Sequence, residues 1–424
     1  MWTKLRHLRT PLGRKRLRKQ AATRLVPLVI GVARWHRRRL GARTRLVAII
    51  GSIGKSTTTA AITAVLEPGA RPSTRNGMER AVVEVLRCGP WRRHATLEAA
   101  LGKTIDMARF GNLLQPDVTV ITAIASDHGP DFGSLEAVRD EKARFLGGIR
   151  AGGRLVINGD DPQVRAMVAG RPEPVVTYGH AAGNTVRAVA WQLDWPHGTR
   201  LTVAVGERTV EVRSRLLGLA MTYPVLAALA VAMVEGVALE RAVAALATVA
   251  PAPCRLQLLP LPGGGWIIDD SYKCTLESMD AALDLLAQVP GRRLAVLGPA
   301  TDIIGSAKAP HRRIGARLPG LVDLAVLVAS SSKPIASGAA AAGMPRSSLI
   351  KAGDTAEEAL AAIRPLLRPG DVVLVKGRHD LKLSRVALAL AGRDVRCRLD
   401  RCRIFELACG DCPMLGRATP DVRS

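Results

Sequence analysis

From residue 46 onward, short runs of Val, Ile and Leu alternate with stretches of helical spacing. The apolar runs lie at 46–50, 118–124, 154–157, 266–268, 294–297, 324–328 and 371–375. Near-continuous apolar runs of this length suit strands that are buried on both faces of a parallel sheet. Helical segments such as 278–287 and 356–367 lie between them. The alternation therefore predicts an α/β fold.

The chain of 424 residues is long enough for two or three domains. Residues 186–214 break the alternation and predict a small antiparallel sheet attached to the first α/β unit, and Pro251-Ala-Pro-Cys predicts a linker. The expected divisions are a basic leader over 1–45, a first α/β unit over 46–250, a second over 251–395 and a Cys-rich tail over 396–424.

Much of the net charge of +25 lies in the leader. Residues 1–45 hold 15 of the 61 Lys and Arg residues and no acid, whereas the other 46 bases face 36 acids. The leader has no small-residue cleavage site, and no stretch reaches the ~18 apolar residues of a membrane span. The seven cysteines are odd in number and unevenly spaced, unlike a secreted disulfide framework. We therefore expect a cytoplasmic protein.

The leader has three interpretations. Its basic charge and the apolar run 25–33 match the two signals that peripheral membrane association needs. It could instead bind nucleic acid nonspecifically, or be a solvated arm. The apolar run and Trp35 favour association of residues 1–45 with the inner face of a membrane over nucleic-acid binding.

The strongest local motif is a strand that runs into a glycine turn and a Lys-Ser-Thr helix start. It reads Leu46-Val-Ala-Ile-Ile-Gly51-Ser-Ile-Gly54-Lys55-Ser56-Thr57-Thr58. Backbone N–H groups and the helix N-terminus can bind a triphosphate there, with Lys55 on the β- and γ-phosphates and Ser56 on Mg²⁺. The predicted nucleotide-binding residues of this loop are Gly51, Ser52, Gly54, Lys55, Ser56 and Thr57.

The loop has the short G-x-x-G-K-[ST] form, which resembles the ATP site of the Mur ligases, peptidoglycan amide ligases related to folylpolyglutamate synthase. Further segments in the family's order are Ala95-Thr-Leu-Glu98, Ile124-Ala-Ser-Asp-His128 with Lys142 behind it, Leu155-Val-Ile-Asn158, Arg255-Leu-Gln257, Ile267-Ile-Asp269-Asp270-Ser271-Tyr272 and Val375-Lys376-Gly377. The Asp-Asp-Ser-Tyr run is most similar to the member that adds D-alanyl-D-alanine. The resemblance implies a P-loop-type central ATPase domain with a small antiparallel β subdomain, followed by a Rossmann-like C-terminal domain.

The resemblance also implies a chemistry. These ligases phosphorylate a carboxylate with ATP, and an amine then attacks the acyl phosphate to give an amide. Such phosphoryl transfer needs positioning and charge neutralisation. The implied Mg²⁺ ligands are Ser56 and Glu98 for one ion, and His128 and a carbamate on Lys142 for a second.

From the second domain, the resemblance implies that Arg255 reaches the γ-phosphate and that Asp270 contacts the nucleotide. Each residue also has a plain structural alternative. Glu98 and Asp270 could simply end strands, His128 could be a solvated loop residue, and Lys142 could lie on a solvated helix face.

Three features depart from the family. Only the leader precedes the loop, where the peptidoglycan enzymes have a domain that binds the UDP-sugar. Gly218-Leu-Ala-Met221 replaces the Gly-x-His-Asn that contacts adenine, and Lys273-Cys-Thr-Leu276 replaces Asn-Ala-Asn-Pro near the substrate side. We therefore expect a different acceptor or amine.

The tail reads Cys397-x₄-Cys402-x₆-Cys409-x₂-Cys412, and its second pair has zinc-knuckle spacing. A structural Zn²⁺ could fold such a tail, and four reduced thiols are the alternative.

These observations predict an ATP- and Mg²⁺-dependent ligase that joins a small-molecule carboxylate to an amine, on an amino-acid-derived or cell-envelope substrate. The alternative is a P-loop scaffold that binds nucleotide without ligation and is held on a membrane or nucleic acid by its leader. The altered adenine segment favours the scaffold, whereas Lys142 and Asp270 favour the enzyme.

Overall fold

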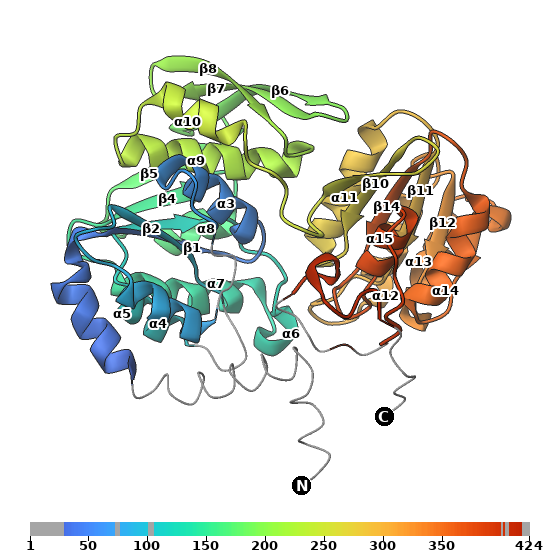
Figure 1. Ribbon diagram of the computed structural model, residues 1–424, viewed down its shortest axis with the longest axis horizontal. Helices are drawn as coiled ribbons and strands as arrows, with labels where there is room; N and C mark the ends of the chain where they lie inside the picture. Colours follow the sequence, from blue (N-terminus) through green and yellow to red (C-terminus); the bar gives the residue numbers. More distant parts are fainter. Residues whose placement is uncertain (1–28, 73–76, 101–105, 400–401, 403–406, 418–424) are drawn as a thin grey trace, which may run out of the picture.

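Two sheets form the centres of two lobes in the computed structural model, which describes residues 29–72, 77–100, 106–399, 402 and 407–417 (Figure 1). The first sheet has the order β2-β1-β3-β4-β5-β6-β7-β8. Its strands are β1 (Arg45–Ile50), β2 (His94–Glu98), β3 (Val118–Ile121), β4 (Arg154–Asn158), β5 (Val175–Gly179), β6 (Val186–Asp194), β7 (Gly198–Val205) and β8 (Arg208–Ser214). The pairs from β2 to β6 are parallel and the last two are antiparallel.

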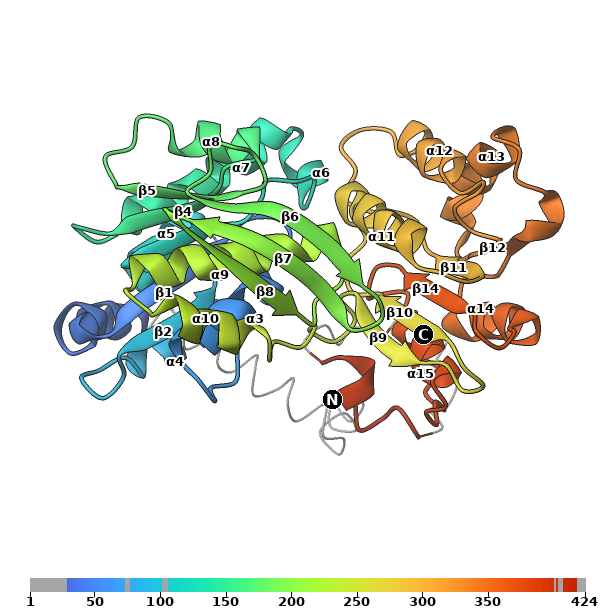
Figure 2. The same cartoon turned by 90° about the horizontal axis from the view of Figure 1, so that it is seen from above.

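The predicted antiparallel strands continue the parallel sheet instead of forming a separate one. The connection is the short parallel pairing of β5 with β6, in which Tyr178 lies opposite Val186. Seen from above, β6 and β7 extend toward the second lobe (Figure 2). There Trp195, next to the tip of this hairpin, lies edge-on to Trp266 at a centroid distance of 6.4 Å.

Helices cover both faces of the first sheet. One face carries α3 (Lys55–Leu66), α9 (Thr222–Val234) and α10 (Leu239–Leu246), and the other carries α4 (Met78–Leu86), α5 (Met107–Leu114), α7 (Leu135–Ala143) and α8 (Pro162–Val168), with the single turn α6 (Gly129–Phe132) beside them. Helix α9 is apolar on nearly every side because it lies between the sheet and the neighbouring helices α3 and α10.

The second sheet has the order β13-β12-β11-β14-β10-β9, and only the pairing of β9 with β10 is antiparallel. Its strands are β9 (Gln257–Pro260), β10 (Trp266–Asp270), β11 (Arg293–Leu297), β12 (Leu324–Leu327), β13 (Leu349–Lys351) and β14 (Val372–Lys376). One face packs against α11 (Leu276–Gln288), α12 (Lys308–Ala316) and α13 (Lys333–Ala341), and the other against α14 (Ala356–Ile363) and α15 (Ser384–Leu390). The α/β prediction of a P-loop lobe followed by a Rossmann-like lobe is confirmed.

Part of the segment that we assigned to the leader packs on the first lobe. Residues 29–39 are helical, and Ala33 and Arg37 of this helix are fully buried. Residues 1–28, on which the rest of the leader interpretations depend, lie outside the described residues. Within the described part of the chain, no helix is both long and apolar enough to cross a membrane.

Candidate active site

The loop that follows β1 has the backbone that its glycines predict. Gly51 has φ 137°, and a Cβ built there would lie 2.1 Å from Oγ1 of Thr122. Gly54 is left-handed with φ 81° and caps α3. Both positions require glycine, because other L-residues rarely adopt this backbone. The loop thereby leads β1 directly into the N-terminus of α3, where backbone N–H groups favour an anion.

Lys55, in the first turn of α3, is folded back over this loop. Its ammonium group donates to the carbonyl oxygens of Gly51 at 2.9 Å and Ser52 at 3.0 Å, and its side chain is buried. Burial and the nearby Lys273 lower the pKa of Lys55 to about 8. A buried cation whose hydrogen bonds go to neutral carbonyl oxygens is favourably placed for an added anion.

Ser56 and Glu98 form a buried pair beside the loop. The Ser56 hydroxyl donates to Oε2 of Glu98 at 2.7 Å. Glu98 ends β2, and the parallel register places it opposite Ile49 of β1. A hydroxyl from the first turn of α3 and a carboxylate at the carboxyl end of β2 thus meet at the edge of the sheet where ligands bind in open α/β folds.

Lys142 approaches the same loop from α7. Its side chain is 1% exposed, and its ammonium group donates to the carbonyl oxygen of Gly51 at 3.1 Å. Burial and the charge of Lys55 lower the pKa of Lys142 to about 7. The solvated helix face that was the alternative for Lys142 is therefore not what the structure shows.

The loop after β3 places Asp127 toward the lysines and leaves His128 more exposed. Asp127 is buried, whereas the His128 side chain is 29% exposed and has a left-handed backbone with φ 63°. His128 lies 3.8 Å from an Asp127 oxygen and 3.7 Å from an Asp131 oxygen. The sequence analysis selected His128 as the site residue of this loop and missed Asp127.

In the second lobe, Asp270 ends β10 and pairs with Lys376 at the end of β14. The Lys376 ammonium group donates to Oδ2 of Asp270 at 2.6 Å, and the backbone N–H of Leu256 donates to Oδ1 at 3.2 Å. Lys376 also donates to the carbonyl oxygen of Lys273 at 2.7 Å. In this arrangement the Asp270–Lys376 pair fixes the loop that carries Lys273, and the nucleotide contact of Asp270 stays a prediction.

Lys273 crosses from the second lobe to the first. Its ammonium group lies 2.5 Å from Oδ2 of Asp127 and donates to the carbonyl oxygen of Ser52 at 3.2 Å. Although burial opposes the shift, Lys273 and Lys55 hold the pKa of Asp127 at about 2. Asp127 is therefore ionised at neutral pH and bridges the two lobes.

A second polar contact joins the lobes next to Lys273. The backbone N–H and the hydroxyl of Ser126 donate to the carboxylate of Glu277 at 3.2 and 3.1 Å. Arg255 lies near this boundary, with its guanidinium group 4.3 Å from the ring centroid of Tyr272. Its charge is close enough to Lys55 to lower the pKa of that lysine further. The structure thus brings together Lys55, Ser56, Glu98, Asp127, Lys142, Arg255 and Lys273.

Lys273 was noted in the sequence only as a departure from Asn-Ala-Asn-Pro, and no role followed from it. Its contacts depend on how two lobes meet, so no periodicity within either lobe predicts them. The signal that could have found it is the replacement of a neutral residue by a lysine directly after an Asp-Ser-Tyr motif.

The described part of the tail packs on itself through backbone hydrogen bonds. Backbone N–H groups of Arg396 and Cys397 donate to the carbonyl oxygen of Leu415 at 2.8 and 2.9 Å, and Leu415 is buried. Among the residues that the structure describes, which include all four tail cysteines, no group of three or more His, Cys, Asp or Glu side chains could hold a metal ion. The zinc prediction is therefore not supported.

Comparison with known proteins agrees with this geometry. The Mur ligase middle domain matches residues 49–232, and the Mur ligase glutamate ligase domain matches residues 254–379. The UDP-N-acetylmuramoyl-tripeptide–D-alanyl-D-alanine ligase of Mycobacterium tuberculosis is 31% identical over 377 residues, which cover 82% of this chain and 73% of that protein. The chain belongs to the Mur ligase family.

Other Mur ligases extend the comparison. The Escherichia coli enzyme of the same name is 27% identical over 370 residues, covering 85% of this chain and 79% of that protein. MurF from Acinetobacter baumannii has the same fold, with a TM-score of 0.76 at 22% identity over 86% of this chain and 80% of that one. MurF from Thermotoga maritima in complex with ADP also has this fold, with a TM-score of 0.74 at 22% identity over 87% of this chain and 83% of that one.

Membership in the Mur ligase family makes this chain an ATP-dependent enzyme that forms C–N bonds between small molecules. ATP and Mg²⁺ are the cofactors typical of the family. The predicted family, enzyme class and general activity are confirmed.

Proposed function

We propose that this Mur ligase phosphorylates a carboxylate of an amino-acid-derived or cell-envelope substrate and couples the acyl phosphate to an amine in the cytoplasm, where ATP is available. The observation that carries the proposal is the convergence of three lysines, from α3, α7 and the second lobe, on the carbonyl oxygens of Gly51 and Ser52. Three buried or half-buried cations around one glycine loop suit a polyphosphate that transfers a group to an anion.

The residues present fit ATP and Mg²⁺. The buried Ser56–Glu98 pair offers the hard oxygen ligands that Mg²⁺ prefers, and among the described residues the ammonium group of Lys55 donates hydrogen bonds only to loop carbonyls. When bound, Mg²⁺ would supply charge neutralisation at the phosphates. Lys55 would hold the β- and γ-phosphates, the backbone of Gly51 to Gly54 would bind them, and Thr57 would lie in the first turn of the helix behind them.

Lys142 is suited to carry a carbamate. A neutral amine forms a bond from its nitrogen to the carbon of CO₂ and releases a proton, which leaves a carboxylate-like anion. The pKa of about 7 leaves a large neutral fraction of Lys142 at physiological pH, unlike an ordinary lysine. With His128, this group would complete a second Mg²⁺ site next to Asp127.

The second lobe would complete the site on closure. Lys273 contributes a cation directly at the loop, and Arg255 would reach the γ-phosphate from the same side. The Lys273–Asp127 and Ser126–Glu277 contacts hold the lobes together and would exclude water from the acyl phosphate. The relatives named above act on D-alanyl-D-alanine, and we propose that an amino acid or short peptide is the amine here as well.

The proposal is tested by trapping the acyl phosphate. The protein is incubated with ATP, Mg²⁺, hydroxylamine and a panel of carboxylates that includes peptide-bearing cell-envelope precursors, and ADP and hydroxamate are measured. We expect hydroxamate with one class of carboxylate and its loss in Lys55→Ala. Arg213→Ala, at an exposed position on β8, is the matched control and should behave as the unsubstituted protein. ATP binding without ADP or hydroxamate from any carboxylate would instead favour the nucleotide-binding scaffold.

A further inference from the structure

Large apolar side chains are exposed on one part of the first lobe. Of the ten such side chains in the described chain, six lie between residues 32 and 91: Val32, Trp35, Leu40, Val83, Leu86 and Trp91. The two tryptophans are 58% and 72% exposed. Tryptophan is normally highly buried in a soluble protein, so two exposed indoles in one region of the lobe indicate a surface that meets a partner.

Two segments that are far apart in the sequence present these side chains together. The ring of His36 hydrogen-bonds to the carbonyl oxygen of Cys88 at 2.7 Å, and the Thr44 hydroxyl exchanges hydrogen bonds with the backbone of Gly89 at 2.8 and 3.0 Å. Trp35 directly precedes His36, and Trp91 follows Gly89 by two residues. We call the exposed side chains of residues 32–43 and 87–93 the indole face.

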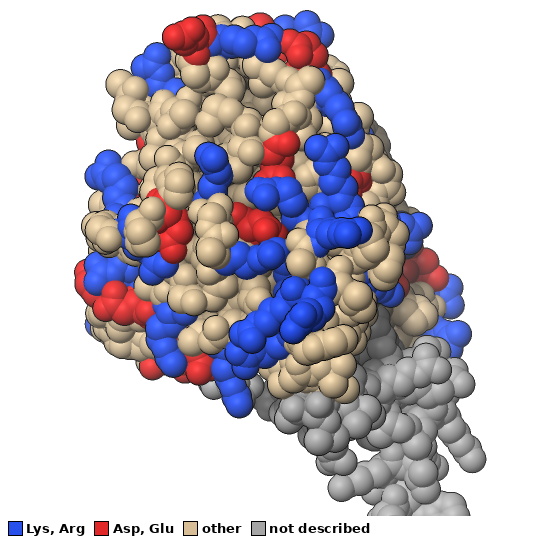
Figure 3. Space-filling view, turned by 90° about the vertical axis from the view of Figure 1, so that its left-hand side faces the viewer, with Lys and Arg blue, Asp and Glu red and all other residues tan. Residues whose placement is uncertain are grey.

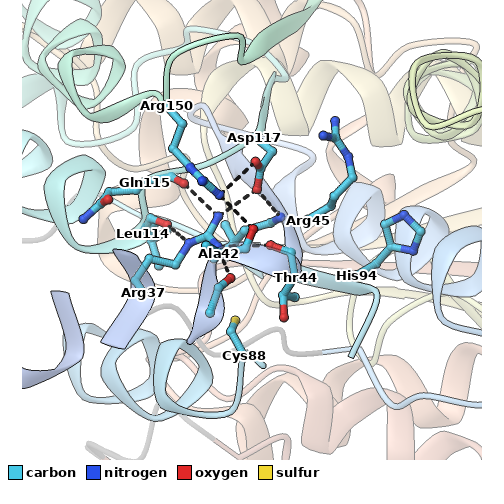
Figure 4. Close-up of polar contacts among 12 residues, drawn as sticks. Arg37, Ala42, Thr44, Arg45, Cys88, His94, Leu114, Gln115, Asp117 and Arg150 are labelled. Carbon is cyan, nitrogen blue, oxygen red and sulfur yellow. Dashed lines mark hydrogen bonds and ion pairs between the residues drawn. The ribbon is translucent and has the colours of Figure 1, made fainter. Parts of the chain in front are cut away.

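Arg37 fixes the helix of residues 29–39 on the first lobe, so the side of the helix that carries Trp35 stays exposed. Arg37 donates to the carbonyl oxygens of Leu114 at 2.9 Å, Thr44 at 3.0 Å and Gln115 at 2.9 Å, and to Asp117 at 2.7 Å (Figure 4). The helix lies at the left-hand edge of the first lobe (Figure 1). A buried arginine with this many partners fixes both the position and the rotation of the helix.

The indole face is also basic. Among the described residues, its exposed arginines Arg38, Arg39, Arg43 and Arg93 have no ion-pair partner, whereas Arg87 pairs with Glu84. No acid precedes Glu67 in the sequence. Figure 3, which looks onto this side of the molecule, shows bands of Lys and Arg beside uncharged surface. The face therefore attracts a polyanion.

We propose that the indole face docks the protein on an anionic lipid surface, with the two tryptophans in the headgroup region and the arginines over the lipid phosphates. Tryptophan prefers this interfacial depth, and basic residues close to an anionic surface are attracted to it. Exposed aliphatic side chains such as Val32 and Leu40 favour lipid over nucleic acid, because a phosphate backbone offers no apolar layer in which to bury them. The proposal is independent of the ligase reaction.

The test is co-sedimentation of the full chain with vesicles of phosphatidylcholine alone and with phosphatidylglycerol added, at low and high salt. We expect binding only with phosphatidylglycerol, with a fraction that resists high salt. Trp35→Ser/Trp91→Ser should remove the salt-resistant fraction and weaken low-salt binding by roughly tenfold or more, since each indole buries a large apolar area. Arg38→Glu/Arg39→Glu should weaken binding mainly at low salt.

Two matched controls separate the face from general surface effects. Val175→Ser/Val189→Ser removes apolar side chains that are similarly exposed on β5 and β6, and Arg213→Glu changes a similarly exposed charge; both should bind as the unsubstituted protein. All variants should keep the unfolding temperature and ATP turnover of the parent. The proposal is overturned if phosphatidylglycerol vesicles do not bind, if the tryptophan variant binds like the parent, or if the face binds a single-stranded oligonucleotide and not vesicles.

Discussion

Two clusters of buried cations lie in the first lobe, and they differ in how their charge is balanced. Arg37 is fully buried, yet carbonyl oxygens and the Asp117 carboxylate surround its guanidinium group. Lys55 and Lys142 are also buried, but they share the carbonyl oxygen of Gly51 and repel each other, and their pKa values fall to about 8 and 7. A buried cation with a full set of partners is part of the fold, since losing one partner of the pair is costly, whereas crowded cations with few partners are prepared for an anion that the fold itself does not supply.

The sharpest way to break this comparison is to remove Lys142. We expect Lys142→Ala to lower turnover by about 100- to 1000-fold, because loss of a group that stabilises transition-state charge has effects of this size. The protein should remain folded, because the substitution removes the repulsion between the buried charges of Lys142 and Lys55. Added formate or acetate should restore part of the activity, which a purely structural lysine would not allow. Arg139→Ala on the same helix is the control and should retain turnover.

Arg37→Met tests whether the buried arginine and its partners serve the stability of the fold. Removing one partner of a buried ion pair costs about 3 to 5 kcal/mol, so the free energy of unfolding in urea should fall by that amount. Arg38→Met, one residue along and exposed, should change it by less than about 0.5 kcal/mol. Turnover per folded molecule should be unchanged in both. A large loss of turnover without loss of stability in Arg37→Met would contradict the division between structural and functional cations.

Lys273→Asn, which restores the residue type usual in the family, is expected to lower kcat/KM for ATP by less than Lys142→Ala lowers turnover. A hydrogen bond to a charged group contributes about 1.5 to 3 kcal/mol, which corresponds to a loss of roughly 10- to 100-fold in kcat/KM for ATP. Loss of the bond to Asp127 should also open the lobes, measurable as a larger radius of gyration in solution scattering. If kcat/KM and the radius both stay at the parental values, Lys273 has no part in closure.

The smallest effect is expected on the stability of the fold when Glu235 is replaced. Glu235 accepts hydrogen bonds from Arg45 and His94. Burial opposes the shift, but these partners lower the pKa of Glu235 from 4.5 to about 2. A depressed carboxyl pKa stabilises the fold above pH 4.5, and this contribution is lost as the pH falls from 4.5 toward 2. Since Arg45 is half exposed, Glu235→Gln should destabilise by only about 1 kcal/mol at pH 7. The difference from the parent should shrink below pH 4, and an equal difference at both pH values would contradict the assignment.

The sequence could predict features that depend on neighbouring residues, but not the partners of buried charges. The strands and the Gly51–Ser56 loop follow from local patterns, because hydrophobic periodicity and glycine turns act over short distances. Arg37 stands in a row of arginines that resembles a solvated leader, and only the distant Asp117 distinguishes it from Arg38 and Arg39. The Lys273–Asp127 bridge is likewise a contact between lobes. Partners of buried charges lie far apart in the chain, so their pairing had to come from the structure.

The anchoring of Arg37 has a consequence for synthesis of the chain. Its partners Leu114, Gln115 and Asp117 follow it by 77 to 80 residues. At about 5 to 20 residues per second, roughly 4 to 16 seconds pass before the ribosome has added them. During that interval Arg37 lacks Asp117 and the two distant carbonyl oxygens that fix the helix in the folded protein. The helix can therefore take its final position on the first lobe only after the start of β3 has been made, well after the helix itself.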